Sequence, residues 1–178
     1  MKLIYSLLTL SIFFVACQPK VDNSAKEAFE KNSETVKANL KGFESENVDY
    51  SHYADNFVMP NTSFGGKDSL SLDDVKVSDK DMWQRYDFKL LTDPLVLLPG
   101  VNTDTKEFDG SVRYYADWQV TLPATDSTEA RSGVLNFYEY YVFDENGKII
   151  QQAGYGDFGG LFGYLHADYD DGGGEDMD

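Results

Sequence analysis

The fold is decided by the stretch Phe137-Tyr138-Glu139-Tyr140-Tyr141-Val142-Phe143-Asp144-Glu145-Asn146-Gly147-Lys148-Ile149. Aromatic and β-branched residues dominate its first half, which predicts a strand over about 134–143. Residues 144–147 are a turn signal, and Gly147 suits the left-handed backbone of a bulged hairpin. Another strand is predicted over about 148–155. The stretch therefore indicates an antiparallel hairpin of two long strands.

A further long strand precedes this hairpin. Apolar and polar residues alternate over 111–122, which predicts a strand with one apolar face. The apolar positions are Val112, Tyr114, Ala116, Trp118, Val120 and Leu122. A shorter strand is predicted at Leu95–Leu98, before Pro99-Gly100. These segments predict an antiparallel sheet that buries one face.

The first predicted helix covers about 24–43, where apolar side chains fall on one helical stripe. Ser24 and Glu27 have the spacing of a capping box at its start. Because helices come before a run of antiparallel strands, the order predicts an α+β fold with the helices on one face of the sheet.

Two more helical segments are predicted before the strands. A short helical turn starts near Val48, and its shared face would hold Tyr50, Tyr53 and Phe57. A second main helix starts at Ser78 and ends before Pro94. Its buried stripe would hold Met82, Tyr86 and Leu90.

Three short motifs carry a family resemblance: Tyr53-Ala54-Asp55-Asn56-Phe57, the hairpin 137–149, and Tyr155-Gly156-Asp157 followed by Leu161–Leu165. They resemble the Y-A-D-D segment, the F-Y-D-x-W-x-F-D-E-x-G-K-I hairpin and the closing Y-x-D of SnoaL-like proteins in the NTF2-like superfamily. The resemblance covers roughly 25–165 and implies a cone, in which a curved antiparallel sheet has helices packed on its concave face. Sheets of this family often pair, so it also implies a homodimer through the sheet.

The resemblance leaves the chemistry open, because the family holds isomerases, cyclases, dehydratases, epoxide hydrolases and members without known activity. Two of its active-site patterns are broken here. The offset at which ketosteroid isomerases carry a catalytic Asp lands on Asn61, which cannot act as a base. The Arg-x-Asp pair of limonene-epoxide-hydrolase-like enzymes is replaced by Arg113 and Asp117, which are four residues apart.

Two carboxylates are the candidate catalytic groups. A bulge at Gly147 sets Phe143 opposite Ile149, and strand alternation then aligns two rows of side chains facing the cone. The rows are Phe137, Glu139, Tyr141 and Phe143, and Ile149, Gln151, Ala153, Tyr155 and Asp157. A buried carboxylate without a partner has a raised pKa, which suits general acid–base catalysis.

Asp157 best matches the acid/base position that SnoaL-type cyclases hold near the end of the last strand, with Glu139 or Tyr155 in support. The structural alternative is that Glu139 bonds a Tyr hydroxyl and Asp157 bonds backbone at the sheet edge.

Aromatic residues indicate a binding cavity. Twelve Tyr and twelve Phe exceed what a core of this size needs, so some are expected to line the cone. The candidate ligand-binding residues are Tyr53, Phe57, Trp118, Phe137 and Tyr141. No nucleophile elbow, phosphate loop or dinucleotide fingerprint occurs, so no cofactor is expected. His52 and His166 have no acids spaced to join them, so no metal is expected either.

The N-terminus has the layout of an export signal. Lys2 precedes an apolar run over 3–16 that is too short to cross a bilayer, which needs roughly 20 helical residues. Phe14-Val15-Ala16-Cys17 resembles the lipobox of bacterial lipoproteins, which implies acylation of Cys17, including palmitate. Cys17 is the only cysteine and cannot form an internal disulfide. The alternative is an ordinary secretion signal with a chance Cys.

The predicted organisation has four parts. Residues 1–16 are the signal peptide, 17–23 a lipidated tether, 24–167 the domain and 168–178 a disordered acidic tail. The tail lacks the frame of a calcium loop. Gln18 is not the Asp associated with inner-membrane retention, so the lipoprotein resemblance implies a cell-envelope protein anchored in the outer membrane. A formal net charge of −16 argues against nucleic acid as a partner.

Three functions remain open. The leading hypothesis is a membrane-anchored protein that binds a small, largely apolar ligand without established catalysis. The second is a SnoaL-like cyclase, isomerase or dehydratase that uses Asp157. The third is a protein-interaction module that uses the open sheet face. A cavity of about 300 Å³ or more with convergent carboxylates favours the first two, and a filled cone favours the third.

Overall fold

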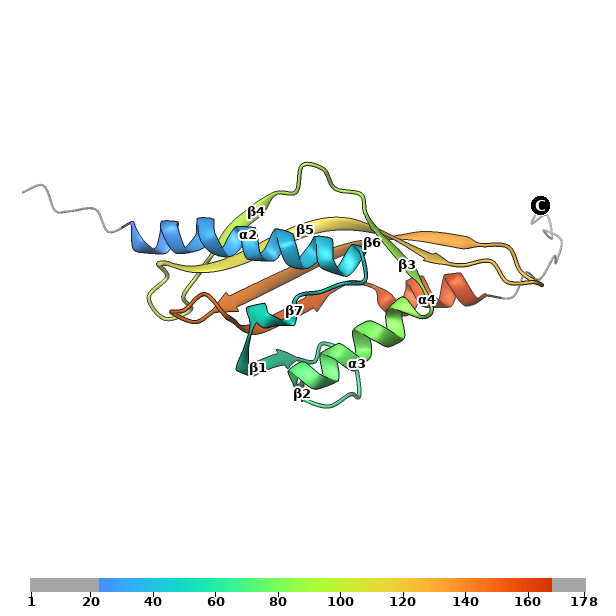
Figure 1. Ribbon diagram of the computed structural model, residues 1–178, viewed down its shortest axis with the longest axis horizontal. Coiled ribbons are helices and arrows are strands. Elements are labelled where there is room, and N and C mark those ends of the chain that lie inside the picture. Colours follow the sequence, from blue (N-terminus) through green and yellow to red (C-terminus); the bar gives the residue numbers. More distant parts are fainter. Residues whose placement is uncertain (1–22, 168–178) are drawn as a thin grey trace, which may run out of the picture.

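The computed structural model describes residues 23–167, and the predicted hairpin lies at the centre of its sheet (Figure 1). β6 (Arg131–Phe143) pairs antiparallel with β7 (Ile149–Tyr155). Gly147 has a φ of 78°, as the turn requires, and the Asp144 side chain accepts a hydrogen bond from the backbone N–H of Lys148 at 2.8 Å. The signal segment, Cys17 and the acidic tail lie outside the described residues.

β5 (Phe108–Leu122) is the longest strand and pairs with β6 over 112–122. Its other edge pairs with β4 (Leu97–Val101) and β3 (Asp87–Leu90). The alternation predicted for β5 is confirmed, because Val112, Tyr114, Ala116, Trp118 and Val120 are all buried. The short strand predicted at Leu95–Leu98 begins two residues later.

β1 (Tyr53–Pro60) extends the sheet on the other side of the hairpin, parallel to β7, and β2 (Ser69–Leu70) pairs with β1. The strand order is β2-β1-β7-β6-β5-β3, with β4 also beside β5. The predicted helical turn near Val48 is only the 3-10 helix η1 (Tyr50–His52). Tyr53 and Phe57 therefore lie in a strand, and the helical face expected for them was wrong.

α2 (Ser24–Glu44) matches the first predicted helix, but its N-terminus differs. The helix begins at Ser24 with Asn23 as the N-cap, so the predicted capping box of Ser24 and Glu27 was wrong. α2 packs closely on β5 where Gly110 has a φ of 77° and its carbonyl accepts a hydrogen bond from Asn32 Nδ2 at 2.9 Å.

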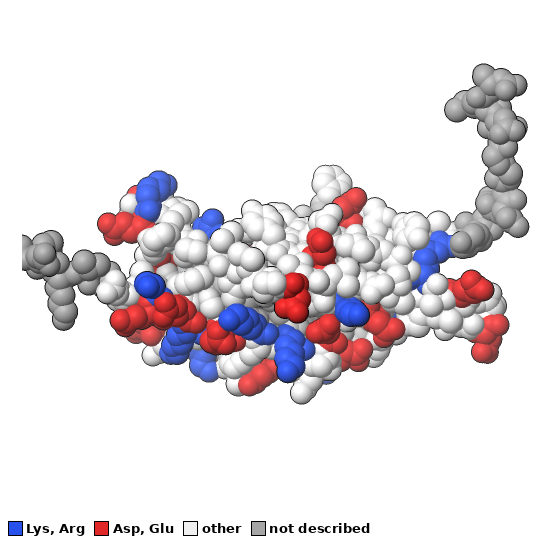
Figure 2. Space-filling view, turned by 90° about the horizontal axis from the view of Figure 1, so that it is seen from above, with Lys and Arg blue, Asp and Glu red and all other residues white. Residues whose placement is uncertain are grey.

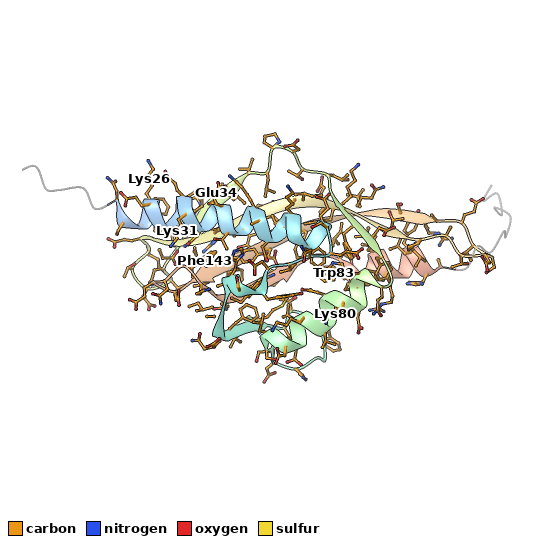
Figure 3. All side chains as sticks on the ribbon, in the orientation of Figure 1. Lys26, Lys31, Glu34, Lys80, Trp83 and Phe143 are labelled. Atoms are coloured by element: carbon orange, nitrogen blue, oxygen red, sulfur yellow. The ribbon has the colours of Figure 1, made fainter. Side chains whose placement is uncertain are left out.

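α3 (Leu72–Trp83) starts earlier than predicted. Ser71 accepts from the backbone N–H of Asp74 at 3.2 Å, and the Asp74 side chain accepts from the backbone N–H of Ser71 at 2.9 Å. This capping box gives the backbone N–H groups of Ser71 and Asp74 their hydrogen-bond acceptors. The helix therefore begins after Ser71 and not at Ser78. The helix ends at Trp83 (Figure 3). The ring centroid of Trp83 lies 5.6 Å from that of Phe43 near the end of α2.

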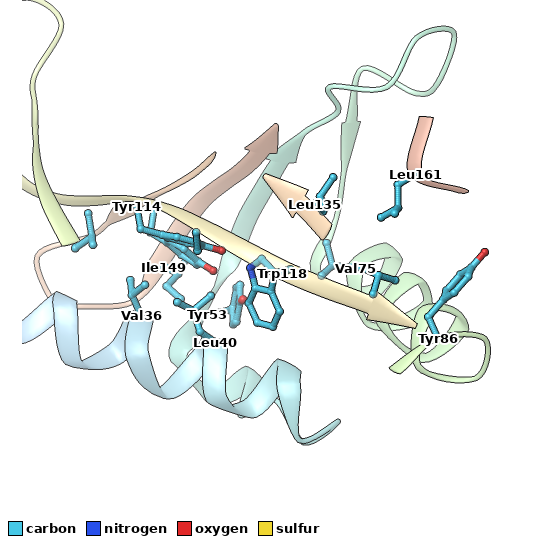
Figure 4. Packing of buried hydrophobic residues seen from close by; sticks show 14 of the residues in the cluster. Val36, Leu40, Tyr53, Val75, Tyr86, Tyr114, Trp118, Leu135, Ile149 and Leu161 are labelled. Atoms are coloured by element: carbon cyan, nitrogen blue, oxygen red, sulfur yellow. The ribbon is translucent and has the colours of Figure 1, made fainter. Parts of the chain in front are cut away.

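The core lies between the helices and the apolar face of β5. Figure 4 shows Val36 and Leu40 of α2 facing Tyr114, Trp118 and Ile149 of the sheet. α4 (Phe158–His166) packs on β6 at one end of the sheet. The predicted α+β architecture, a curved sheet with helices on its concave face, is confirmed. Within residues 23–167 no helix has the length and apolar character needed to span a membrane.

Candidate functional site

A cavity of about 380 Å³ lies between the sheet and the three helices. Aromatic side chains from every layer line it: Phe43, Tyr53, Phe88, Tyr114, Trp118, Phe137, Tyr141, Phe158 and Phe162. Four of the five predicted ligand-binding residues are among them. The fifth, Phe57, does not line the cavity; it is 4% exposed and packs edge-on against the Tyr53 ring at 5.0 Å.

Glu139 forms the polar floor of this cavity and is 5% exposed. Its Oε2 accepts hydrogen bonds from the hydroxyls of Tyr114 at 2.6 Å and Tyr141 at 2.8 Å. Its Oε1 accepts from Gln152 Nε2 at 2.7 Å. The prediction that Glu139 points into the cone is confirmed, and so is the alternative that it bonds Tyr hydroxyls, since both hold at once.

A longer chain of hydrogen bonds continues from the Glu139 carboxyl group. The Gln152 amide N–H donates to Glu139, so the Gln152 Oε1 is left as an acceptor. It accepts a hydrogen bond from the Tyr53 hydroxyl at 2.8 Å. The Tyr53 oxygen in turn accepts from Asn39 Nδ2 at 2.7 Å. The chain ends at Asn39 Oδ1, a buried acceptor that has no hydrogen-bond partner. Both Asn39 and Gln152 also line the cavity.

Burial is the largest influence on these pKa values. It raises the pKa of Glu139, and the hydrogen bonds from Tyr114, Gln152 and Tyr141 oppose this rise. The pKa values of Tyr114 and Tyr141 are raised well above 10. Burial is the larger cause, and the nearby Glu139 carboxyl group is the second. The tyrosines therefore stay protonated and act as donors toward the carboxylate.

A bulge in β7 decides which of its residues face the cavity. Phe143 pairs with Ile149 as predicted, but Val142 pairs with Gln151, so Ile150 is an extra residue in the strand. One extra residue reverses the alternation beyond it. Gln152 and Gly154 therefore lie opposite Tyr141 and Glu139, and the predicted cavity row Gln151, Ala153, Tyr155 and Asp157 was wrong.

Tyr155 and Asp157 consequently do not line the cavity. Tyr155 is 50% exposed and lies beside Tyr138 on the opposite face of the sheet, with 6.0 Å between ring centroids. Asp157 is exposed and caps α4, where its side chain accepts from the backbone N–H of Gly160 at 2.9 Å. The backbone-bonding alternative for Asp157 is confirmed. Its role is to start the helix that carries Phe158 and Phe162 to the cavity.

Asp79 on α3 is a cavity carboxylate that the sequence interpretation missed. Its Oδ2 accepts a hydrogen bond from the Tyr50 hydroxyl at 2.7 Å. Burial raises its pKa to about 6, against the lowering effect of that bond. The helix start at Ser71 was the missed signal: it would have placed Leu72, Val75, Asp79 and Met82 on one stripe, with an acid among apolar residues.

The other residues considered from the sequence have different surroundings. Asn61 lines the cavity, whereas Asp117 lies on the exposed face of β5 and accepts from Asn136 Nδ2 at 2.7 Å. His166 bonds the Tyr86 hydroxyl at 2.7 Å. In the part of the chain that the structure describes, no three His, Cys, Asp or Glu are grouped to hold a metal. On the face in Figure 2, Lys and Arg lie among Asp and Glu and form no continuous basic patch.

Comparison with known proteins identifies the fold. No family model and no curated protein sequence matches the chain. Solved structures do match. IdmH of Streptomyces antibioticus, a proposed polyketide cyclase, matches with a TM-score of 0.57 and 12% identity over 77% of this chain and 99% of that one.

Two further structures agree. A proposed polyketide cyclase of Xanthomonas campestris has a TM-score of 0.56 and 15% identity over 72% of this chain and 91% of its own. An epoxide hydrolase of M. tuberculosis, described as LEH-like, has a TM-score of 0.51 and 14% identity over 76% and 90%. At these identities the likeness establishes the fold alone. Residues 23–167 thus adopt an α+β fold of the NTF2-like type, which these solved structures share.

Proposed function

We propose that this chain is a lipid-anchored envelope protein that binds a small, largely apolar ligand in its aromatic cavity. The supporting observation is the cavity itself, about 380 Å³ with nine aromatic side chains around a few buried polar groups. Ligand pockets typically measure about 300–1,000 Å³ and combine apolar walls with a small number of placed polar groups. A cone filled by side chains, as an interaction module would have, does not fit this cavity. Anchoring through Cys17 and placement in the outer membrane are part of the proposal.

Calorimetric titration with phenylbutanol tests the binding function. This ligand has an apolar body and one hydroxyl, and we expect saturable binding to the full chain in detergent. Met59→Trp should fill part of the cavity that Met59 lines and weaken binding at least tenfold. Val58→Trp is the matched control, because Val58 is the next residue in β1 and is 44% exposed. No binding of phenylbutanol, together with no small molecule retained in native mass spectrometry, contradicts the proposal.

A second candidate function is acid–base catalysis, and one observation favours it. Glu139 and Asp79 are two carboxyl groups with raised pKa values that line the same cavity. A group that titrates near the working pH serves best as a general acid or base. With Asp157 outside the cavity, Asp79 is the acid/base of this alternative and Glu139 the supporting group.

Assays for epoxide hydrolysis and for cyclisation of polyketide-like substrates test this alternative, because the similar structures include an epoxide hydrolase and a proposed polyketide cyclase. Asp79→Asn should lower the rate about 10²–10⁴-fold, the usual contribution of a positioned acid or base. An unchanged rate in Asp79→Asn removes Asp79 from the mechanism.

A further inference from the structure

Carboxyl groups are the charged part of the cavity lining. Two carboxylates, Glu139 and Asp79, line it, and no Lys, Arg or His of the described residues does. The nearby tyrosine hydroxyl protons are already committed: those of Tyr114 and Tyr141 to Glu139, that of Tyr53 to Gln152, and that of Tyr50 to Asp79. A ligand in this part of the cavity therefore meets the carboxyl groups of Asp79 and Glu139 and no basic side chain of residues 23–167.

Asn39 adds an independent sign that a donor is missing. It is 5% exposed and its Oδ1 has no hydrogen-bond partner, although nearly all buried polar atoms are paired. Reversing the amide would remove the donor that the Tyr53 and Tyr141 hydroxyl oxygens now have in Asn39 Nδ2. A ligand N–H group at this point would complete the network.

The walls suit the same ligand. The cavity lining includes the aromatic rings of Trp118, Tyr114 and Phe137. An organic cation within about 6 Å of such a ring is attracted by its quadrupole, most strongly when water is excluded. Aromatic walls with carboxylates and no cation are the combination that recognises ammonium groups.

We propose that the cavity takes an organic cation: a protonated amine carried on an apolar alkyl or aromatic body. This inference rests on the proposed binding function and names its ligand class. The ammonium group bonds Asp79 and the free Asn39 oxygen, and the apolar body lies against the aromatic rings. The chain's net charge of −16 also attracts cations and repels acids before contact.

Three probes of one shape and different charge test the inference: phenylbutylamine, phenylbutanol and phenylbutyrate. Titrated into the full chain in detergent at pH 7.5, the amine should bind at least tenfold more tightly than the alcohol, and the acid should bind weakest. Equal or tighter binding of the alcohol or the acid overturns the inference while leaving the proposed binding function intact. Failure of all three probes counts against the binding function itself.

Asp79→Asn keeps the size of the side chain and removes its charge. It should weaken binding of phenylbutylamine about 10- to 100-fold, the range expected for a hydrogen bond to a charged group, and weaken phenylbutanol binding by a clearly smaller factor. Asp81→Asn is the matched control, because Asp81 is an exposed acid on the same helix that does not line the cavity. Equal loss of amine binding in both variants assigns the effect to net charge and overturns the site.

Discussion

At the scale of single residues, the cavity is unusual in its buried carboxyl group. Glu139 has no basic side chain among the described residues that line the cavity with it, so hydrogen bonds alone stabilise its ionised form. Three donors surround it, and hydrogen bonds to charged groups contribute about 1.5–3 kcal/mol each. Truncating the carboxylate would leave all three donors without an acceptor.

We therefore expect Glu139→Ala to lower the free energy of unfolding by about 3 kcal/mol or more, through unpaired donors and a small added void. Urea denaturation followed by circular dichroism measures this loss. Glu145→Ala, at an exposed position of the hairpin turn, is the control and should stay within about 0.5 kcal/mol of wild type. A loss below 1 kcal/mol for Glu139→Ala shows that the network does not hold the fold together.

The raised pKa of Asp79 predicts that the stability of the protein depends on pH. Because burial raises its pKa from 3.8 to about 6, the folded state binds the proton more tightly than the unfolded state does. Below pH 3.8 both states are protonated, so the group has no effect on stability. Between pH 3.8 and about 6 the Asp79 side chain increasingly lowers the free energy of unfolding as pH rises. Above that range the destabilisation stays at its full size.

Replacing the acid by an amide removes this cost. Asp79→Asn should unfold at higher denaturant than wild type at pH 7, with a gain of about 1–2 kcal/mol that vanishes near pH 4. The charged and titratable neighbours are Tyr50 on η1, Glu139 on β6 and Lys76, whose Nζ lies 5.6 Å from the Tyr50 ring centroid. A gain that is equal at pH 4 and pH 7 refutes the buried acid as its cause.

At the scale of elements, the bulge at Ile150 shapes the site. It places Gln152 beside Glu139 and turns Tyr155 outward, where it joins Tyr138 and Tyr115 on the exposed face. It also places Gly154 on the cavity side, opposite Glu139. A side chain at 154 would occupy space that the Phe137 ring now fills, since an added Cβ would lie 2.2 Å from Phe137 Cζ.

Gly154→Ala should therefore displace the Phe137 ring and reduce the cavity. We expect phenylbutanol affinity to fall about tenfold, with a loss of stability of about 1–3 kcal/mol from overpacking. Gly163→Ala on α4 is the control, because an added Cβ there meets nothing within 4 Å. Calorimetry and urea denaturation check both variants. Unchanged affinity in Gly154→Ala means that the ligand does not reach this part of the cavity.

At the scale of the whole molecule, the proposed anchor determines where the cavity operates. Cys17→Ser removes the only thiol that an acyl chain could use. We expect the variant to leave the membrane fraction on cell fractionation, because two or more acyl chains normally provide stable anchoring. Wild-type protein supplies the control, and radiolabelled palmitate should enter it and not the variant. A variant that still sediments with membranes contradicts the lipoprotein proposal.

Local sequence patterns determined much of this protein. Alternation in β5 predicted which side chains are buried, and the hairpin around Gly147 predicted the pairing of Phe143 with Ile149. These features depend on near neighbours in the chain. The stripe of α2 was predicted for the same reason, although the position of its cap was not.

Only the tertiary structure decided the site. The bulge at Ile150 depends on how β7 fits between β1 and β6, and it reversed the placement of Tyr155 and Asp157. Asp79 reaches the cavity because α3 starts at the Ser71 cap and packs on β1. Its carboxyl then meets residues far away in the chain. Contacts between segments far apart in the chain decide which face of the sheet a strand residue points to and how deeply it is buried. The periodicity of a local stretch of sequence does not reveal these contacts.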